Sequence, residues 1–281
     1  MNYAVAPPPG VDTTRASVAR VYDYYLGGKD HYEIDRKMAA DLERAFPEVA
    51  HLARDNRHLL TRICRFIAYQ TGIRQYIDCG SGLPTAENVH QIVQRADSTA
   101  RVVYVDYDPV VTAHGLALLV ENDFTDFIQA DIYEPERILH HPTVDENINW
   151  NEPVAVLFLA TLHHQTEDPD APAAVTKAFI DRMPSGSYLA ISHLLDPRDG
   201  SEDEQTVNKL LETVHNGPMR DVMARTRAQI RELFHDMEMV PSGPGKPAGI
   251  VHSVDWWPDG PMLRERTIAQ QIMVAGVARK P

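Results

Sequence analysis

The sequence predicts an α/β fold in which helices cover both faces of a doubly wound, mostly parallel sheet. Three observations lead to this prediction. Apolar strand patterns alternate with helical patterns after residue 72, as they do in βαβ units. Residues 153–160 form a continuous apolar run, which is typical of a parallel strand buried on both faces. Residues 12–71 show only helical periodicity and predict a helical extension before the sheet.

The N-terminal region divides into a tail and three helices. Residues 1–11 contain three consecutive prolines, so we expect a mobile tail. The spacing of apolar residues then predicts helices at residues 14–25, 35–45 and 48–69. We group residues 12–71 as a helical cap or lid and residues 72–281 as the core, and we expect the two to form one domain.

Seven strands follow in the core, separated by helices. The strands are expected at residues 75–79, 101–105, 124–129, 153–160, 186–193, 237–240 and 270–277. The helices are expected at residues 85–95, 109–120, 171–183, 202–214 and 226–235.

The composition excludes several classes of protein. The chain has 281 residues, a net charge of −13 and 43% hydrophobic residues, as an ordinary folded protein does. No stretch approaches the roughly 20 apolar residues of a membrane span, and the start of the sequence lacks the pattern of a signal peptide, so we expect a cytoplasmic location. The acidic charge argues against nucleic acid as a partner. Cys64 and Cys79 are too few for a disulfide framework and are expected to be buried.

Residues 78–85, DCGSGLPT, predict a ligand-binding turn. Gly80 and Gly82 come directly after a strand, where glycine permits positive φ and a close approach of ligand to backbone. A dinucleotide fingerprint would have glycine in place of Thr85, and Pro84 lacks the N–H that a pyrophosphate would bind. The turn therefore favours an adenosine ligand without phosphates over NAD. A plain strand-to-helix turn is the alternative for a glycine pair alone.

Three carboxylates end the first three strands. Asp106 lies 24 residues beyond Gly82, where a carboxylate can accept hydrogen bonds from both ribose hydroxyls. Asp78 and Asp131 are expected at the same edge of the sheet, and clustered carboxylates repel one another unless a cation is present. S-adenosyl-L-methionine carries a sulfonium and an ammonium group but no phosphate, so this pattern favours it as the ligand.

Four segments of the sequence carry a family resemblance. They are RVYDYYLGGKD at residues 20–30 with DR at 35–36, the turn at 78–85, VDYDP at 105–109 and LHH at 162–164. The chain resembles the class I S-adenosylmethionine-dependent methyltransferases, and most closely a bacterial S-adenosyl methyltransferase family long catalogued as a domain of unknown function. The resemblance covers residues 12–280. It implies a Rossmann-like sheet of seven strands and direct, in-line transfer of a methyl group to an acceptor.

The resemblance also implies site residues. Gly80, Ser81 and Gly82 would line the methionine moiety, Asp106 would bind the ribose, and Asp131 with Ile132 would flank the adenine. Four further residues are counted with the cofactor-binding set: Tyr22, Gly28, Asp78 and Asp108. This chain has His31 where the family usually has Asn.

Two histidines follow the fourth strand, where the acceptor pocket lies in this fold class. His163 or His164 could act as general base for a hydroxyl or amine acceptor, and the alternative is that the pair caps the end of the strand. A metal site made from these histidines with Glu167 or Asp168 is disfavoured, because adjacent histidines seldom face one ion. We therefore predict no metal, and the net charge of −13 favours a small-molecule acceptor over nucleic acid.

Three other features each have two interpretations. Residues 22–30 form either a lid that excludes water or a structural cap with half-buried tyrosines. A cluster of arginines late in the chain forms either a solvated helix face that pairs with acids such as Asp221 and Glu232 or, through Arg225 or Arg227, an anchor for a substrate carboxylate; its members are Arg220, Arg225, Arg227 and Arg231. Trp256 and Trp257 either floor the acceptor pocket or anchor a buried loop.

Two rival functions are compatible with the sequence. A non-catalytic sensor or scaffold would bind S-adenosylmethionine or S-adenosylhomocysteine without turnover. A nicotinamide oxidoreductase on a related sheet would bind NAD. The sequence predicts neither the methyl acceptor nor the oligomeric state.

Overall fold

One sheet organises the computed structural model, which describes residues 11–84, 87–118, 122–165, 167–219 and 222–281. Except for Val11, the tail expected at residues 1–11 lies outside these described residues. The same holds for Thr85, on which the argument against a dinucleotide partly rests, and for the end of the helix expected at residues 109–120.

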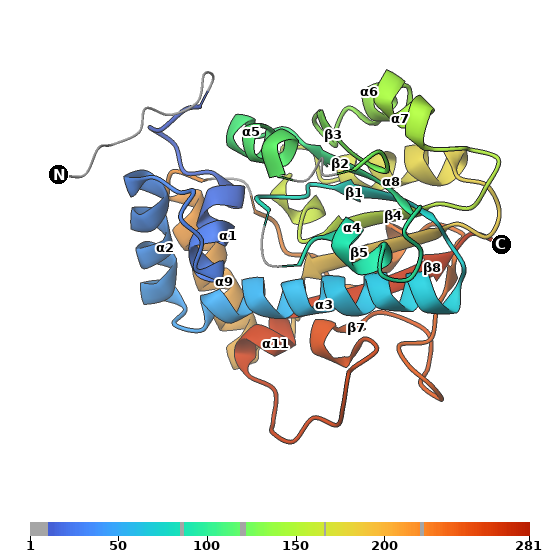
Figure 1. Cartoon of the computed structure of the whole chain (residues 1–281). Helices are drawn as coiled ribbons and strands as arrows, with labels where there is room; N and C mark the ends of the chain where they lie inside the picture. Colours follow the sequence, from blue (N-terminus) through green and yellow to red (C-terminus); the bar gives the residue numbers. More distant parts are fainter. Residues whose placement is uncertain (1–10, 85–86, 119–121, 166, 220–221) are drawn as a thin grey trace.

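The sheet has the strand order β3-β2-β1-β4-β5-β8-β6, and β7 pairs with β8 off this path (Figure 1). Strands β1 to β5 are parallel, and β8 runs antiparallel to β5, β6 and β7. The mostly parallel, doubly wound sheet is therefore confirmed, with eight strands instead of seven in the described part of the chain. The strands are β1 (Gln75–Cys79), β2 (Arg101–Asp106), β3 (Thr125–Gln129), β4 (Ala155–Leu159), β5 (Tyr188–Leu194), β6 (Glu238–Met239), β7 (Val251–His252) and β8 (Met273–Arg279).

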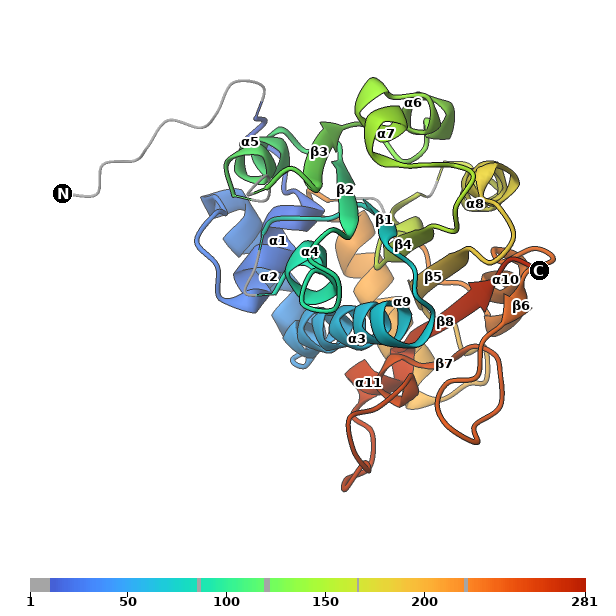
Figure 2. The ribbon, with the colours of Figure 1, turned by 45° about the vertical axis from the view of Figure 1, so that its right-hand side comes forward.

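Side chains that alternate along the strands supply a hydrophobic core on each face of the sheet. Tyr76 on β1 packs in the core that includes α3 (Val49–Gln70). Its neighbour Ile77 packs on the other face, in the core that includes α8 (Ala171–Arg182). Figure 2 shows the two helical layers on either side of the strands. The other helices over the sheet are α4 (Val89–Val93), α5 (Pro109–Leu118), α6 (Pro135–Leu139), α7 (Pro142–Asn147) and α10 (Arg227–Glu232).

The cap helices form a third core with two helices from the end of the chain. Here α1 (Val18–Leu26) and α2 (Glu33–Ala45) pack with α9 (Glu202–His215) and α11 (Ile268–Ile272). Figure 1 shows α1, α2 and α9 together at one end of the sheet. The helical extension is thus joined to the core through apolar packing as well as through the chain.

Several predicted elements differ from the structure at their ends. The strand expected at residues 270–277 begins as α11, because Thr267 and Gln270 form a reciprocal capping box that starts a helix. The first helix begins at Val18 instead of residue 14. The helix expected at residues 85–95 spans only α4 in the described chain, capped by Asn88. The sequence analysis missed α6 and α7, which are short and begin with proline.

Some predictions about single side chains are confirmed. Cys64 and Cys79 are fully buried and unpaired. Trp256 is fully buried, and Trp257 packs against the same core, so the pair anchors a buried loop and does not line the cavity described below. Within the described residues, no helix has both the length and the apolar character to cross a membrane.

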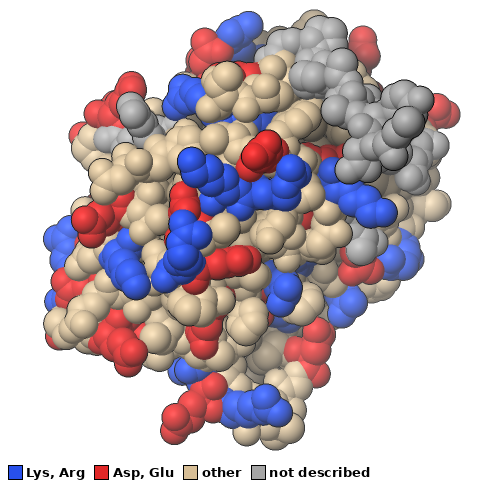
Figure 3. Space-filling model, turned by 90° about the vertical axis from the view of Figure 1, so that its left-hand side faces the viewer, with Lys and Arg blue, Asp and Glu red and all other residues tan. Residues whose placement is uncertain are grey.

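The cap carries almost no net charge. Residues 12–71 contain ten Lys and Arg and nine Asp and Glu, so the rest of the chain carries the acidic excess. Figure 3 views the cap side of the molecule and shows the two signs intermixed across it. A nucleic-acid backbone would require a continuous basic surface there, and this face does not present one over the described residues.

Candidate cofactor and acceptor site

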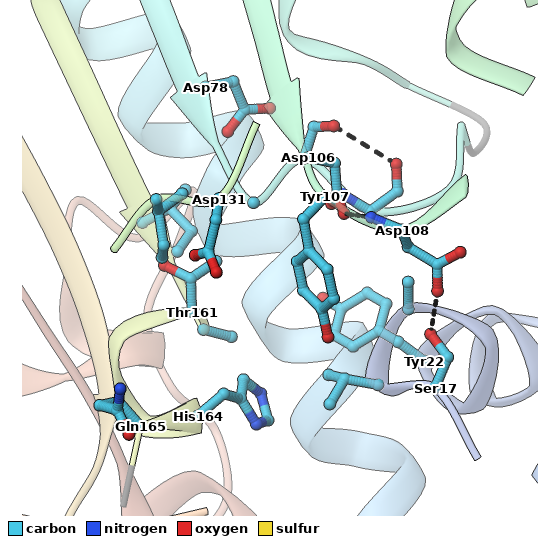
Figure 4. Close-up of a pocket in the computed structure, with 18 of the residues that line it drawn as sticks. Ser17, Tyr22, Asp78, Asp106, Tyr107, Asp108, Asp131, Thr161, His164 and Gln165 are labelled. Atoms are coloured by element: carbon cyan, nitrogen blue, oxygen red, sulfur yellow. Dashed lines mark hydrogen bonds between the residues drawn. The ribbon is translucent and has the colours of Figure 1, made fainter. Parts of the chain in front are cut away.

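A cavity of about 370 Å³ lies at the carboxyl ends of β1, β2 and β4, a size typical of small-molecule pockets. The direction of winding reverses between β1 and β4, and ligands bind at such reversals in open α/β sheets. Residues of α1 and α3 form the wall on the cap side. Figure 4 shows Asp78, Asp106 and Asp131 around the cavity, with His164 extending toward the ring of Tyr107.

The turn after β1 requires glycine for two reasons. Gly80 and Gly82 have φ values of 75° and 66°, which side chains with a Cβ rarely adopt. A Cβ on Gly80 would also collide with the methyl group of Thr161, in the turn that follows β4. The backbone N–H groups of Gly80 and Ser81 donate to the carbonyl oxygen of Val105, at 2.8 and 3.1 Å. The turn after β1 and the turn after β4 therefore pack directly against each other in the wall of the cavity.

Asp106 ends β2 with its carboxylate fixed at the cavity. Its oxygens accept hydrogen bonds from the backbone N–H groups of Gly82, at 2.9 Å, and Asp108, at 3.0 Å. Burial raises the pKa of Asp106 to about 6 despite these two donors. A buried acceptor of this kind suits hydroxyl donors such as those of a ribose.

Asp108 joins the core to the cap. Its carboxylate accepts from the backbone N–H of Val110, at 2.8 Å, in the first turn of α5. The hydroxyl of Ser17, which precedes α1, donates to the other oxygen of the same carboxylate. One side chain therefore caps a core helix and holds the start of the first cap helix beside the cavity (Figure 4).

Asp78 and Arg57 place opposite charges in one wall. Burial raises the pKa of Asp78 to about 7, the positive charge of Arg57 opposes this rise, and the charge of Asp106 adds to it. Arg57 donates from Nη2 to the Asn88 side chain at 2.9 Å, whereas its buried Nε has no hydrogen-bond partner. A ligand that carries both a carboxylate and an ammonium group has complementary partners here.

The structure separates the two histidines of the turn after β4. His164 lines the cavity, whereas His163 is buried beneath it and does not line it. Burial, followed by the neighbouring His164, His193 and Arg225, lowers the pKa of His163 well below its usual value. His163 is therefore held neutral beneath the cavity, and His164 is the member of the pair that can meet a ligand.

Arg225 and Arg227 do not form a solvated helix face, and that interpretation is wrong. Arg225 is buried and donates to the carbonyl oxygens of Leu162 and Pro169 and to the ring of His193. Arg227 similarly donates to a backbone carbonyl and to the ring of His252. Both guanidinium groups are thus occupied by the protein itself, and neither lines the cavity. Arg220 and Asp221, counted with this cluster, lie outside the described residues.

The lid segment contributes one residue to the cavity wall. Tyr22 lines the cavity, while Tyr25 is buried in the cap with its hydroxyl donating to the carbonyl oxygen of Ala39. Gly28 does not line the cavity, and its backbone N–H donates to the carbonyl oxygen of Asp23. The role of Gly28 here is structural, because a Cβ on it would collide with the Asp23 carboxylate.

The cavity brings together most of the residues predicted from the sequence and adds others. The predicted residues in its wall are Tyr22, Asp78, Gly80, Ser81, Gly82, Asp106, Asp108, Asp131, Ile132 and His164. The residues that the sequence analysis missed include Ser17, Asn56, Arg57, Tyr133, Thr161 and Gln165. Only Thr161 had a usable signal, since it follows a buried strand directly. Among the described residues, no group of three His, Cys, Asp or Glu side chains is arranged to hold a metal ion.

Comparison with known proteins agrees with this geometry. A family model described as S-adenosyl methyltransferase matches residues 5–281. The crystal structure of a candidate methyltransferase from Thermobifida fusca YX is similar, with 38% identity, a TM-score of 0.89 and coverage of 99% of each chain.

A second crystal structure, of a DUF574 family protein from Streptomyces avermitilis MA-4680, has 33% identity and a TM-score of 0.86. That comparison covers 96% of this chain and 99% of the other. No curated protein matches the chain. The two similar structures cover nearly the whole chain, so the likeness includes the cap as well as the sheet.

Proposed function

We propose, for a chain that belongs to the S-adenosyl methyltransferase family and uses S-adenosylmethionine as methyl donor, that the acceptor is a small molecule. The observation that carries this proposal is the cavity itself, which is about 370 Å³ in volume and walled by cap helices as well as by the sheet. A macromolecular acceptor would have to reach past α1. Charges of both signs also occur across the described part of the cap face, which does not favour a nucleic acid as acceptor (Figure 3).

The donor-binding residues follow from the chemistry of the wall. Asp106 accepts the ribose hydroxyls, Asp78 faces the ammonium group, and Arg57, in the same wall, pairs with the carboxylate. The acidic lining suits a cation, and its described residues include no cluster of basic groups for a pyrophosphate. The remaining donor-binding residues in this proposal are Tyr22, Gly80, Ser81, Gly82, Asp108, Asp131 and Ile132.

When bound, S-adenosylmethionine would supply a methyl group attached to a positively charged sulfur, so that in-line attack of the acceptor on the methyl carbon releases S-adenosylhomocysteine. Catalysis is therefore mainly a matter of positioning, and α1, which forms part of the cavity wall, would help to exclude water when a ligand is bound. In this proposal His164, which lines the cavity, takes a proton from a hydroxyl or amine acceptor. The family match gives no support to an oxidoreductase or to a non-catalytic scaffold. The cytoplasmic location stays a prediction.

Calorimetric titration tests the donor site. We expect micromolar binding of S-adenosylmethionine and S-adenosylhomocysteine, no binding of NAD, and loss of binding in Asp106→Ala. Binding of NAD alone would contradict the proposed donor.

Methyl-labelled donor tests the acceptor. When the labelled donor is incubated with the protein and a cell extract, the label should appear in the low-mass fraction. The same incubation without the protein gives the background. Label that enters only protein or nucleic acid would overturn the small-molecule acceptor.

A further inference from the structure

Ala160, the residue after β4, has a left-handed backbone with a φ of 57°. Alanine adopts this conformation only when its surroundings enforce it. Ala160 and the next residue, Thr161, both line the cavity, and His164 follows in the same turn. The conformation of Ala160 therefore sets the direction in which this turn enters the site.

A buried serine holds Ala160 in place. The backbone N–H of Ala160 donates to the hydroxyl oxygen of Ser192, on β5, at 2.8 Å, and over a longer distance, 3.3 Å, to the backbone carbonyl oxygen of the same residue. The Ser192 hydroxyl in turn donates to Oδ1 of Asn56, on α3, at 2.6 Å. Ser192 is fully buried and does not line the cavity, so it has no direct access to a ligand.

The same chain of hydrogen bonds continues into the cap. Nδ2 of Asn56 donates to the hydroxyl oxygen of Tyr22, on α1, at 3.2 Å, and that hydroxyl donates to the carbonyl oxygen of Ala53 at 2.8 Å. Every donor from Ala160 to Tyr22 thus has an acceptor, and the bonds run in one direction, an arrangement in which neighbouring hydrogen bonds strengthen one another. We call the four residues Tyr22, Asn56, Ser192 and Ala160 the relay.

The relay reaches the donor site through a direct contact. The methyl group of Thr161 packs so closely on the turn after β1 that only glycine fits at position 80. If Ala160 relaxed to an ordinary backbone conformation, Thr161 would shift against Gly80 and its neighbours. Ser192, which does not line the cavity, would then affect donor binding without touching the donor.

We propose that Ser192 is a positioning residue, which acts through the relay to hold Ala160 in its left-handed conformation and thereby shapes both the donor turn and the turn that carries His164. The relay also couples the first cap helix to this turn, since Tyr22 is its other end. This proposal rests on the donor site proposed above.

The test measures the affinity for S-adenosylhomocysteine in three variants. Ser192→Ala removes the shorter bond to Ala160, leaves the longer one to the backbone carbonyl of residue 192, and should weaken binding by about tenfold. Ala160→Gly should bind at least as well as the wild type, because glycine adopts positive φ without strain. The double variant should recover most of the lost affinity. Ser192→Cys, which keeps the shape of the side chain, should lie between wild type and Ser192→Ala.

Ser187→Ala is the matched control. Ser187 is equally buried, and its hydroxyl accepts the backbone N–H of Val154 at 3.1 Å, at the opposite end of the same pair of strands. We expect it to lower the melting temperature as Ser192→Ala does and to leave the affinity unchanged.

Each outcome decides the proposal. Unchanged affinity in Ser192→Ala and Ser192→Cys overturns the relay, and so does a loss that Ala160→Gly fails to rescue. If the wild-type protein does not bind S-adenosylhomocysteine, the proposed donor site fails first and the relay fails with it.

Discussion

Arg57 is the residue in the donor site with the most specific chemistry. Its guanidinium is fixed at one end by Asn88 and leaves a buried Nε without a partner. Arg57 lines the cavity, and a guanidinium binds a carboxylate through charge-assisted hydrogen bonds. This residue is expected to contact the carboxylate in the amino-acid part of the donor. Truncated thioadenosines lack that carboxylate and should not depend on Arg57.

Arg57→Met tests that role. We expect a roughly 10- to 100-fold loss of affinity for S-adenosylhomocysteine, which corresponds to a hydrogen bond with a charged group. Affinity for 5′-methylthioadenosine, which lacks the carboxylate, should not change. Calorimetry with both ligands measures the difference, and Arg54→Met, an exposed arginine on the same helix, is the control. Equal losses for both ligands would contradict a carboxylate contact.

Asp78 makes stability depend on pH. The folded protein holds the proton of Asp78 up to a pKa of about 7, whereas an unfolded carboxyl group loses it near its ordinary pKa of 3.8. The free energy of unfolding therefore falls as the pH rises between these two values and levels off above the higher one.

Asp78→Asn removes this dependence. The variant should be more stable than the ligand-free wild type at pH 8, and the difference in melting temperature should shrink toward pH 4. Thermal unfolding across this range gives the answer. A variant that is less stable than wild type at pH 8 would show that the ionised carboxylate is well compensated in the fold.

At the scale of elements, one carboxylate explains much of the motif at residues 20–36. Asp35 is fully buried and accepts from Nε of Arg20 at 2.9 Å, from the backbone N–H of Ser17 at 3.0 Å and from that of Tyr32 at 2.8 Å. Asp35 thus caps α2 and pairs with Arg20 on α1. It also holds Ser17, whose hydroxyl donates to Asp108 at the cavity. The motif therefore holds α1 and α2 against each other.

Asp35→Ala should therefore destabilise the protein by about 3–5 kcal/mol, because it leaves the buried charge of Arg20 uncompensated. Asp41→Ala is the control on the same helix, since Asp41 pairs with an arginine whose side chain is 71% exposed, and it should cost less than about 1 kcal/mol. Denaturant unfolding measures both. Similar costs for the two variants would show that Asp35 has no special role.

At the scale of the whole molecule, the part of the cap formed by α1 and α2 is fastened at two places. Its apolar side packs on α9 and α11. Its other side meets the cavity through Tyr22 and through Ser17, which donates to Asp108. Ligand binding should therefore stabilise the cap together with the sheet, as a lid requires.

Hydrogen exchange with and without S-adenosylhomocysteine tests the lid. Amides of residues 18–45 should exchange more slowly when the ligand is bound, and those of β6 and β7, far along the sheet, should change little. Slower exchange confined to the ends of β1 and β2 would mean that the cap is only a structural support.

How much could be predicted depended on how local each signal is. Buried strands, glycine turns and the acids that end β1 and β2 are local patterns, so the sheet, the turn at residues 78–85 and the acidic wall followed from them. Boundaries were less certain, because a capping box at Thr267 overrode the apolar pattern that favoured a strand. Arg225 was misjudged because its partners lie far away in the sequence, among them Leu162 and His193.

The sequence by itself determined the fold class and the donor, since each rests on residues that are close together along the chain. Only the tertiary structure decided that Arg57 joins Asp78 in the wall, that His164 and not His163 meets the cavity, and that Ser192 holds Ala160. The physical reason is that a cavity is assembled from separate elements. Which face of a helix or turn reaches it depends on packing, which no single segment encodes.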